Sequence, residues 1–145
     1  MLDYGTWMDH FRPYLLVAAS NPEIGLTICS VLRQHDAVPV LVENGRQVAV
    51  TMRDAQFMDT HFDGLLIDYL LPDSCVYHVV NEFREIFPDR PVAVINDRED
   101  LCLKMWARAR GIVVFRRPMV TEELNLWLPH LKAAAMEDPS VLSAR

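Results

Sequence analysis

A short apolar run that ends in a carboxylate is the feature that most constrains the fold of this 145-residue chain. Residues 65–67 are Leu-Leu-Ile, Asp68 follows them directly, and a Leu-Pro pair then starts a loop. An uncharged run of this length between turn residues is typical of a strand covered on both faces in a parallel sheet. In open α/β sheets, ligands bind beyond the carboxyl ends of the strands. Asp68 is therefore the first candidate for a functional residue.

Four further apolar runs alternate with segments of helical periodicity, at residues 14–19, 38–42, 92–95 and 112–115. Pro39 lies inside the second run, which suits a strand at the edge of a sheet. Five strands that alternate with five helices predict an α/β protein with a doubly wound (βα)5, flavodoxin-like fold.

Capping residues predict where several helices begin and end. Asn21 is expected to cap the first helix, with Pro22 at its first position. Asn96-Asp97 is expected to cap the fourth helix in the same way. Pro129 falls inside the last helical segment and should kink or split that helix.

The sequence predicts one domain over residues 14–136, preceded by an N-terminal arm at 1–13 and followed by a C-terminal tail at 137–145. A hydrophobic content of 51% excludes a disordered chain, and no apolar run approaches the ~20 residues of a membrane span. Three widely spaced cysteines favour a reduced, cytoplasmic protein with buried thiols. The net charge of -6 argues against direct nucleic-acid binding, because phosphate contacts need clustered Lys and Arg.

The motifs in this order resemble the receiver domain of bacterial two-component response regulators, over residues 13–135. The matching stretches are Leu-Ile-Asp-Tyr-Leu-Leu-Pro at 66–72, Pro-Val-Ala-Val-Ile at 91–95, Arg-Pro-Met at 117–119, and Asn-Pro-Glu-Ile at 21–24. The resemblance implies a parallel sheet in the order 2-1-3-4-5, with the functional positions gathered at one edge.

In that family, the third strand carries an Asp that accepts a phosphoryl group from a histidine kinase. An acidic pair after the first strand helps to hold Mg²⁺, a Thr or Ser ends the fourth strand, and a Lys-Pro pair follows the fifth. Matched position by position, the chain has the phosphoacceptor candidate Asp68, then Ala19 and Ser20 for the acidic pair, Asn96 for the Thr or Ser, and Arg117-Pro118 for Lys-Pro.

These replacements predict an atypical, degenerate phosphorylation site with no metal cofactor. Mg²⁺ normally uses carboxylates together with substrate phosphate, and Asp68 is the only obvious carboxylate at this edge. A planar guanidinium can bond a carboxylate through two contacts, which the ammonium of Lys cannot do. We therefore expect Arg117 to pair directly with Asp68.

The preferred hypothesis is a pseudo-receiver, a signal-transduction module of a two-component or phosphorelay system that acts through protein–protein contacts and is not an enzyme. Its partner would be a histidine kinase or an effector. The first alternative is a phosphorylatable receiver that accepts a phosphoryl group on Asp68. The second is a small flavodoxin-like enzyme or cofactor binder, although no glycine follows the first strand before Gly25.

Apolar residues outside the predicted core faces suggest an interface. Trp106 lies on the fourth helix, and Leu126 and Trp127 lie on the fifth. Exposed apolar patches usually mark binding surfaces. We expect a homodimer or a partner on the face formed by these two helices and the fifth strand.

Overall fold

The computed structural model of the protein describes residues 12–117 and 120–137. Most of the predicted N-terminal arm, nearly all of the predicted tail, and Pro118 lie outside these ranges. No helix in the described ranges combines the length and the apolar character needed to cross a membrane.

Five parallel strands form the central sheet, in the spatial order β2-β1-β3-β6-β7. This confirms the predicted doubly wound fold and the predicted order of strands 2-1-3-4-5. The strands are β1 (Tyr14–Ala18), β2 (Val38–Val42), β3 (Gly64–Asp68), β6 (Val92–Asn96) and β7 (Val113–Arg116). The helices are α2 (Pro22–Gln34), α3 (Gly45–Phe57), α4 (Val76–Ile86), α5 (Leu101–Ala109) and α6 (Val120–Glu137).

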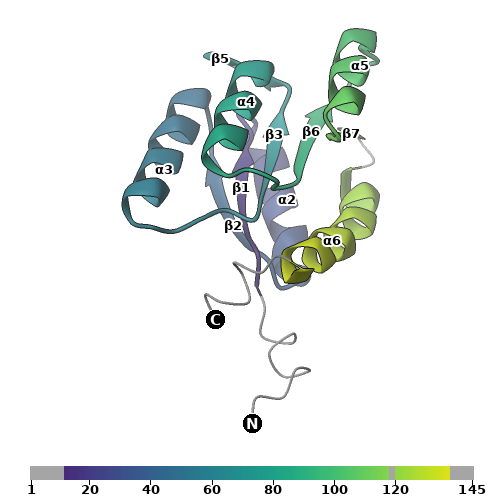
Figure 1. Ribbon diagram of the computed structural model, residues 1–145. Helices are drawn as coiled ribbons and strands as arrows, with labels where there is room; N and C mark the ends of the chain where they lie inside the picture. The colour runs from purple at the N-terminus through teal and green to yellow at the C-terminus, as the bar shows by residue number, and fades with distance from the viewer. Residues whose placement is uncertain (1–11, 118–119, 138–145) are drawn as a thin grey trace.

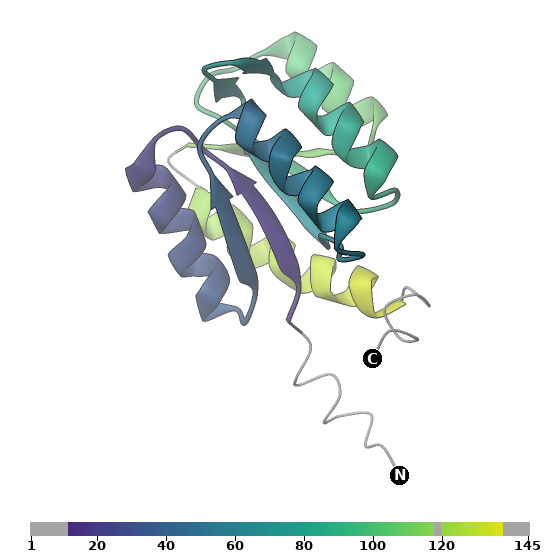
Figure 2. The same cartoon turned by 90° about the vertical axis from the view of Figure 1, so that its left-hand side faces the viewer.

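Helices cover both faces of the sheet (Figures 1 and 2). One buried apolar cluster lies between the sheet and α3, α4 and α5, and a second lies between the sheet and α2 and α6. All five residues of β3 and all five of β6 are buried. Continuous apolar runs therefore form the central strands, as expected for a parallel sheet covered on both faces. Pro39 lies in β2, an edge strand, as predicted.

The predicted cap of the first helix is confirmed, and the predicted cap of the fourth helix is wrong. The Asn21 side-chain oxygen accepts hydrogen bonds from the backbone N–H groups of Glu23, at 3.0 Å, and Ile24, at 3.4 Å. The fourth helix, α5, begins later than predicted, with Asp100 as its N-cap accepting from the Leu103 N–H at 3.0 Å. Asn96 does not cap this helix, because it belongs to β6 and its amide donates to the Arg98 carbonyl at 2.7 Å.

Pro129 does not split α6, which runs as one helix from Val120 to Glu137. Leu124 and Leu128 before the proline and Leu131 after it belong to one buried cluster. Packing on both sides of the proline therefore offsets the lost backbone hydrogen bond.

The cysteines do not share one environment. Cys29 is buried, as predicted, whereas Cys75 and Cys102 are exposed. Cys75 ends the short strand β5 (Ser74–Cys75) and is the N-cap residue of α4, and Cys102 is the second residue of α5. The prediction of buried thiols is wrong for these two.

Candidate functional site

The candidate site lies at the edge where all five parallel strands end. Asp68 is the last residue of β3, and its register partner in β6 is Ile95. Asn96 ends β6 and pairs with Arg116 of β7. The Arg117 N–H donates to the Asn96 carbonyl at 3.1 Å, which fixes the start of the segment after β7. Strand register thus places these residues at one edge, as the sequence predicts.

The Asp68 carboxylate is buried and already has two partners. Asp68 is only 4% exposed. Oδ1 accepts from the backbone N–H of Leu70 at 3.1 Å. Oδ2 accepts from Nη2 of Arg117, which forms an ion pair with it. The predicted pairing of Arg117 with Asp68 is confirmed.

Burial dominates the electrostatics of Asp68. Removal from water raises the pKa of its carboxyl above the ordinary value, because the charged form loses hydration. The Leu70 N–H and the Arg117 guanidinium act in the opposite direction, whereas the nearby charge of Asp97 adds to the rise. The net direction is upward, so the guanidinium offsets only part of the cost of burying this carboxylate.

Asp97 is a second carboxylate near Asp68, which the sequence interpretation assigned only to a helix cap. It follows Asn96 directly, so its position two residues beyond the end of the predicted strand at 92–95 was the available signal. Within the described part of the chain, no three His, Cys, Asp or Glu side chains lie together in a group that could hold a metal ion.

The two adjacent arginines have different roles. Arg116 is exposed, and its guanidinium lies 3.6 Å from Glu99. The Arg117 side chain is only 26% exposed, and it faces the buried acid. Its Nε atom is buried and has no hydrogen-bond partner among the described residues. A guanidinium carries five N–H donors, and the Arg117 guanidinium donates one of them to the Asp68 side chain.

The positions that match the family's acidic pair offer little to a cation. Ala19 is buried, and its backbone N–H donates to the Val42 carbonyl at 3.0 Å. Ser20 is exposed, and its hydroxyl lies 3.5 Å from the Leu70 carbonyl. Ser20 therefore brings one neutral oxygen to this edge where the family has a carboxylate.

The loop after Asp68 forms a small hairpin that was not predicted, β4 (Leu70–Leu71) paired with β5 (Ser74–Cys75). The Asp73 carboxylate accepts from the Gly45 N–H at 2.7 Å and from the Arg46 N–H at 3.0 Å, which fastens the hairpin to the start of α3. A Cβ on Gly45 would lie 1.8 Å from the Ser74 hydroxyl. Only glycine allows this approach, so the loop beside Asp68 is held in place.

Tyr69 connects the site to α5 through a row of aromatic rings. Its hydroxyl donates to the Asp100 carboxylate at 3.1 Å, and its ring packs edge-on against Tyr77. Tyr77 packs edge-on against Trp106, with ring centres 4.7 Å apart, and the Arg110 guanidinium lies over the Trp106 ring. The hydrogen bond to Tyr77, followed by burial and Asp100, raises the pKa of Tyr69. The residue after Asp68 is thereby coupled to a helix that begins more than thirty positions later.

The three interface candidates differ in exposure. Leu126 is 73% exposed, and Trp106 is partly buried. Trp127 is buried and packs edge-on against Phe115, with ring centres 5.6 Å apart. Trp127 is therefore a core residue, and its side chain is not available to a partner.

The solved structures that this chain resembles include receiver domains of response regulators. The chain is similar to the chemotaxis response regulator CheY4 of Vibrio cholerae, with a TM-score of 0.70 and 16% identity over 83% of this chain and 99% of that one. It is similar to a CheY-like receiver domain protein of Methanospirillum hungatei, with a TM-score of 0.75 and 12% identity over 88% and 100% of the two chains. A receiver protein of Sinorhizobium medicae gives a TM-score of 0.71 and 17% identity over 85% and 96%.

These similarities establish the receiver fold for almost the whole described chain. The sequence matches no protein-family model, and no curated protein matches it. At 12–17% identity, the feature shared with these structures is the path of the backbone.

Proposed function

We propose that this protein is a receiver-like signalling module of a two-component or phosphorelay system in which an ion pair occupies the phosphorylation site. The module acts through protein–protein contacts with a histidine kinase or an effector in the cytoplasm, and it has no enzymatic activity of its own. The observation that carries the proposal is the contact between Arg117 and Asp68. One oxygen of the candidate phosphoacceptor bonds a guanidinium and the other bonds a backbone N–H.

The donor set around Asp68 does not fit the Mg²⁺ ion that the receiver resemblance implies. Mg²⁺ requires oxygen ligands in near-octahedral geometry. The Ala19 side chain is a methyl group, and Ser20 supplies a neutral hydroxyl. The positive charge of Arg117 next to Asp68 further disfavours a divalent cation. Phosphoryl transfer depends on stabilisation of the developing negative charge, and this site lacks the acidic ligands for the ion that usually provides it.

The second candidate function is a receiver that is phosphorylated on Asp68. The position of the acid at the end of β3 and the neighbouring carboxylate of Asp97 favour this alternative. The ion pair favours the first function, because a donor that approached Asp68 would have to displace Arg117.

The partner surface that we propose is the face formed by α5, β7 and α6. Leu101 and Met105 on α5 are 72% and 65% exposed, and Val113 of β7 and Leu126 of α6 are also exposed. A soluble protein tends to cover apolar residues grouped in this way. A second copy of the chain or a signalling partner would cover them. The acidic balance of the chain disfavours nucleic acid as the partner.

A titration with Mg²⁺ tests the proposed function. We expect no saturable change in the backbone amide shifts of Asp68, Tyr69 and Asp97 below about 10 mM Mg²⁺, because the acidic ligands are missing. The matched control is the double variant Ser20→Asp/Arg117→Lys, which restores one acid and the ammonium and should bind Mg²⁺ more tightly than the natural sequence. Saturation of the natural sequence below about 1 mM Mg²⁺ would favour the phosphorylatable receiver.

A further inference from the structure

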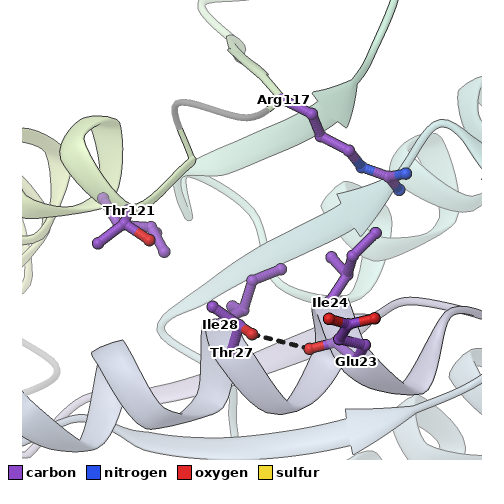
Figure 3. A pocket seen from close by; sticks show the side chains of 7 residues that line it. Glu23, Ile24, Thr27, Ile28, Arg117 and Thr121 are labelled. Carbon is purple, nitrogen blue, oxygen red and sulfur yellow. Dashed lines mark hydrogen bonds between the residues drawn. The ribbon is translucent and has the colours of Figure 1, made fainter.

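A cavity of about 240 Å³ lies beside Arg117, between α2 and the start of α6 (Figure 3). These helices cover the same face of the sheet. The cavity thus lies where three segments that are distant in sequence meet: the first turns of α2, the first turns of α6, and the end of β7. It is separate from the exposed apolar face of α5.

The inner wall of the cavity is apolar. Ile28 and Leu124 belong to the buried cluster beneath α2 and α6, and Ile24 packs against that cluster. Ile28 and Leu124 are at most 1% exposed, so the partly exposed Ile24 supplies most of the apolar surface that the wall leaves open. An apolar group placed there would leave water and gain contacts with Ile24.

The rim of the cavity carries two opposite charges that are not paired with each other. Figure 3 shows the Glu23 carboxylate and the Arg117 guanidinium at the same end, with Thr121 toward the other end. No ion pair joins Glu23 to Arg117 in the structure described above, and Arg117 keeps N–H donors beyond the one that it gives to Asp68. Glu23 is exposed and forms no side-chain hydrogen bond with a described residue.

We propose that this cavity binds a small zwitterion with an apolar side chain, of the hydrophobic α-amino acid class. Its carboxylate would accept from the N–H donors of Arg117 that do not bond Asp68, its ammonium would donate to Glu23, and its side chain would cover the wall at Ile24. A simple anion would meet the carboxylates of Glu23 and Asp68. A simple amine would leave the donors of Arg117 unused. The inference goes beyond the proposed signalling role, because it requires neither phosphorylation nor a protein partner.

Titration of ¹⁵N-labelled protein with L-leucine and L-phenylalanine tests the proposal. We expect saturable shifts at the amides of Thr27, Thr121 and Leu124, with a dissociation constant on the order of 1 mM, as is usual for a ligand of so few atoms. The matched probes 4-methylpentanoate and 3-methylbutylamine share the apolar part of leucine, but each lacks one charge. Each should bind at least about threefold more weakly than leucine, because one charged contact is lost.

Two variants on the exposed side of α2 locate the site. Thr27→Trp places a large ring at the cavity and should weaken amino-acid binding at least about tenfold, because the ring occupies the space of the ligand. Leu26→Trp changes the neighbouring exposed residue, which does not line the cavity, and should leave affinity within about twofold. Glu23→Gln should weaken leucine about two- to fivefold without weakening 4-methylpentanoate, since it removes the partner of the ammonium alone.

The outcomes that would overturn the proposal are specific. The first is the absence of saturable shifts with both amino acids. The second is binding that Thr27→Trp and Leu26→Trp change equally, which would place the ligand elsewhere. The third is equal binding of leucine and its two singly charged analogues, which would mean that neither Glu23 nor Arg117 contacts a charged group of the ligand.

Discussion

Replacing Arg117 by methionine should destabilise the fold in a pH-dependent way. Met keeps a long apolar side chain but removes the guanidinium that bonds Oδ2 of Asp68. The carboxylate would then be left at 4% exposure with the Leu70 N–H as its remaining bonded partner among the described residues. Removing one partner of a fully buried ion pair typically costs about 3–5 kcal/mol. Because Arg117 is itself 26% exposed on its side chain, we expect a loss of about 2–3 kcal/mol at pH 7.

The pH dependence follows from the direction of the Asp68 pKa. Burial already raises this pKa in the folded state, and Arg117 lowers it. In the Arg117→Met variant, the pKa of Asp68 in the folded state therefore lies further above its pKa in the unfolded state. A group with a raised folded-state pKa contributes full stability below its unfolded pKa, and that contribution is lost as the pH rises through the folded pKa. The loss caused by the substitution should be small near the ordinary Asp value of about 3.9 and complete above the raised pKa.

Urea unfolding followed by tryptophan fluorescence, at pH values from about 4 to 8, measures this effect as a shift of the midpoint at constant slope. The matched control is Arg116→Met, the adjacent exposed arginine, which should cost less than about 0.5 kcal/mol at every pH. In an Asp68→Asn background, Arg117→Met should cost less than about 1 kcal/mol, because no buried charge is left unpaired. A loss that is the same at every pH, or the same in both backgrounds, would refute the reasoning.

Three further substitutions test other parts of the account. Asp68→Asn alone should leave the protein as stable at pH 7 or stabilise it by up to about 1 kcal/mol, because it removes a buried charge whose pKa is raised; a loss of stability measured by urea unfolding would contradict this. Asp63→Ala should cost about 1–3 kcal/mol by the same assay, because the fully buried carboxylate accepts from the Tyr14 N–H at 2.8 Å and its removal leaves that donor unsatisfied. Met105→Lys, at an exposed position of α5, should lower the average mass measured by light scattering at high concentration without changing the unfolding midpoint; an unchanged mass would count against self-association through this face.

Strand positions could be predicted because continuous apolar runs determine which segments lie inside a parallel sheet, whereas the order of the strands was implied by the resemblance to receiver domains. The pairing of Asp68 with Arg117 could also be predicted, because the ends of β3 and β7 must meet at the same edge. In both cases, the local pattern and the topology determine the same contact.

Features that depend on side-chain packing could not be predicted in this way. The β4–β5 hairpin is held by the contact of Asp73 with the start of α3, and nothing in the local sequence specifies a partner 28 positions away. Two cap-like residues, Asn96 and Asp97, precede the true cap at Asp100, so propensity alone could not select the start of α5. The burial of Trp127 depends on its contact with Phe115, which belongs to a different element.

The central claim is that the ion pair with Arg117 prevents phosphorylation of Asp68. Its most direct test is an intact-mass measurement after incubation with acetyl phosphate and excess Mg²⁺. We expect the mass of the natural sequence to stay unchanged. The double variant Ser20→Asp/Arg117→Lys should gain the mass of one phosphoryl group in part of the sample, because the ion pair is replaced by groups that suit a cation. Stoichiometric addition of one phosphoryl group to the natural sequence, lost in Asp68→Asn, would contradict the account and establish a phosphorylatable receiver.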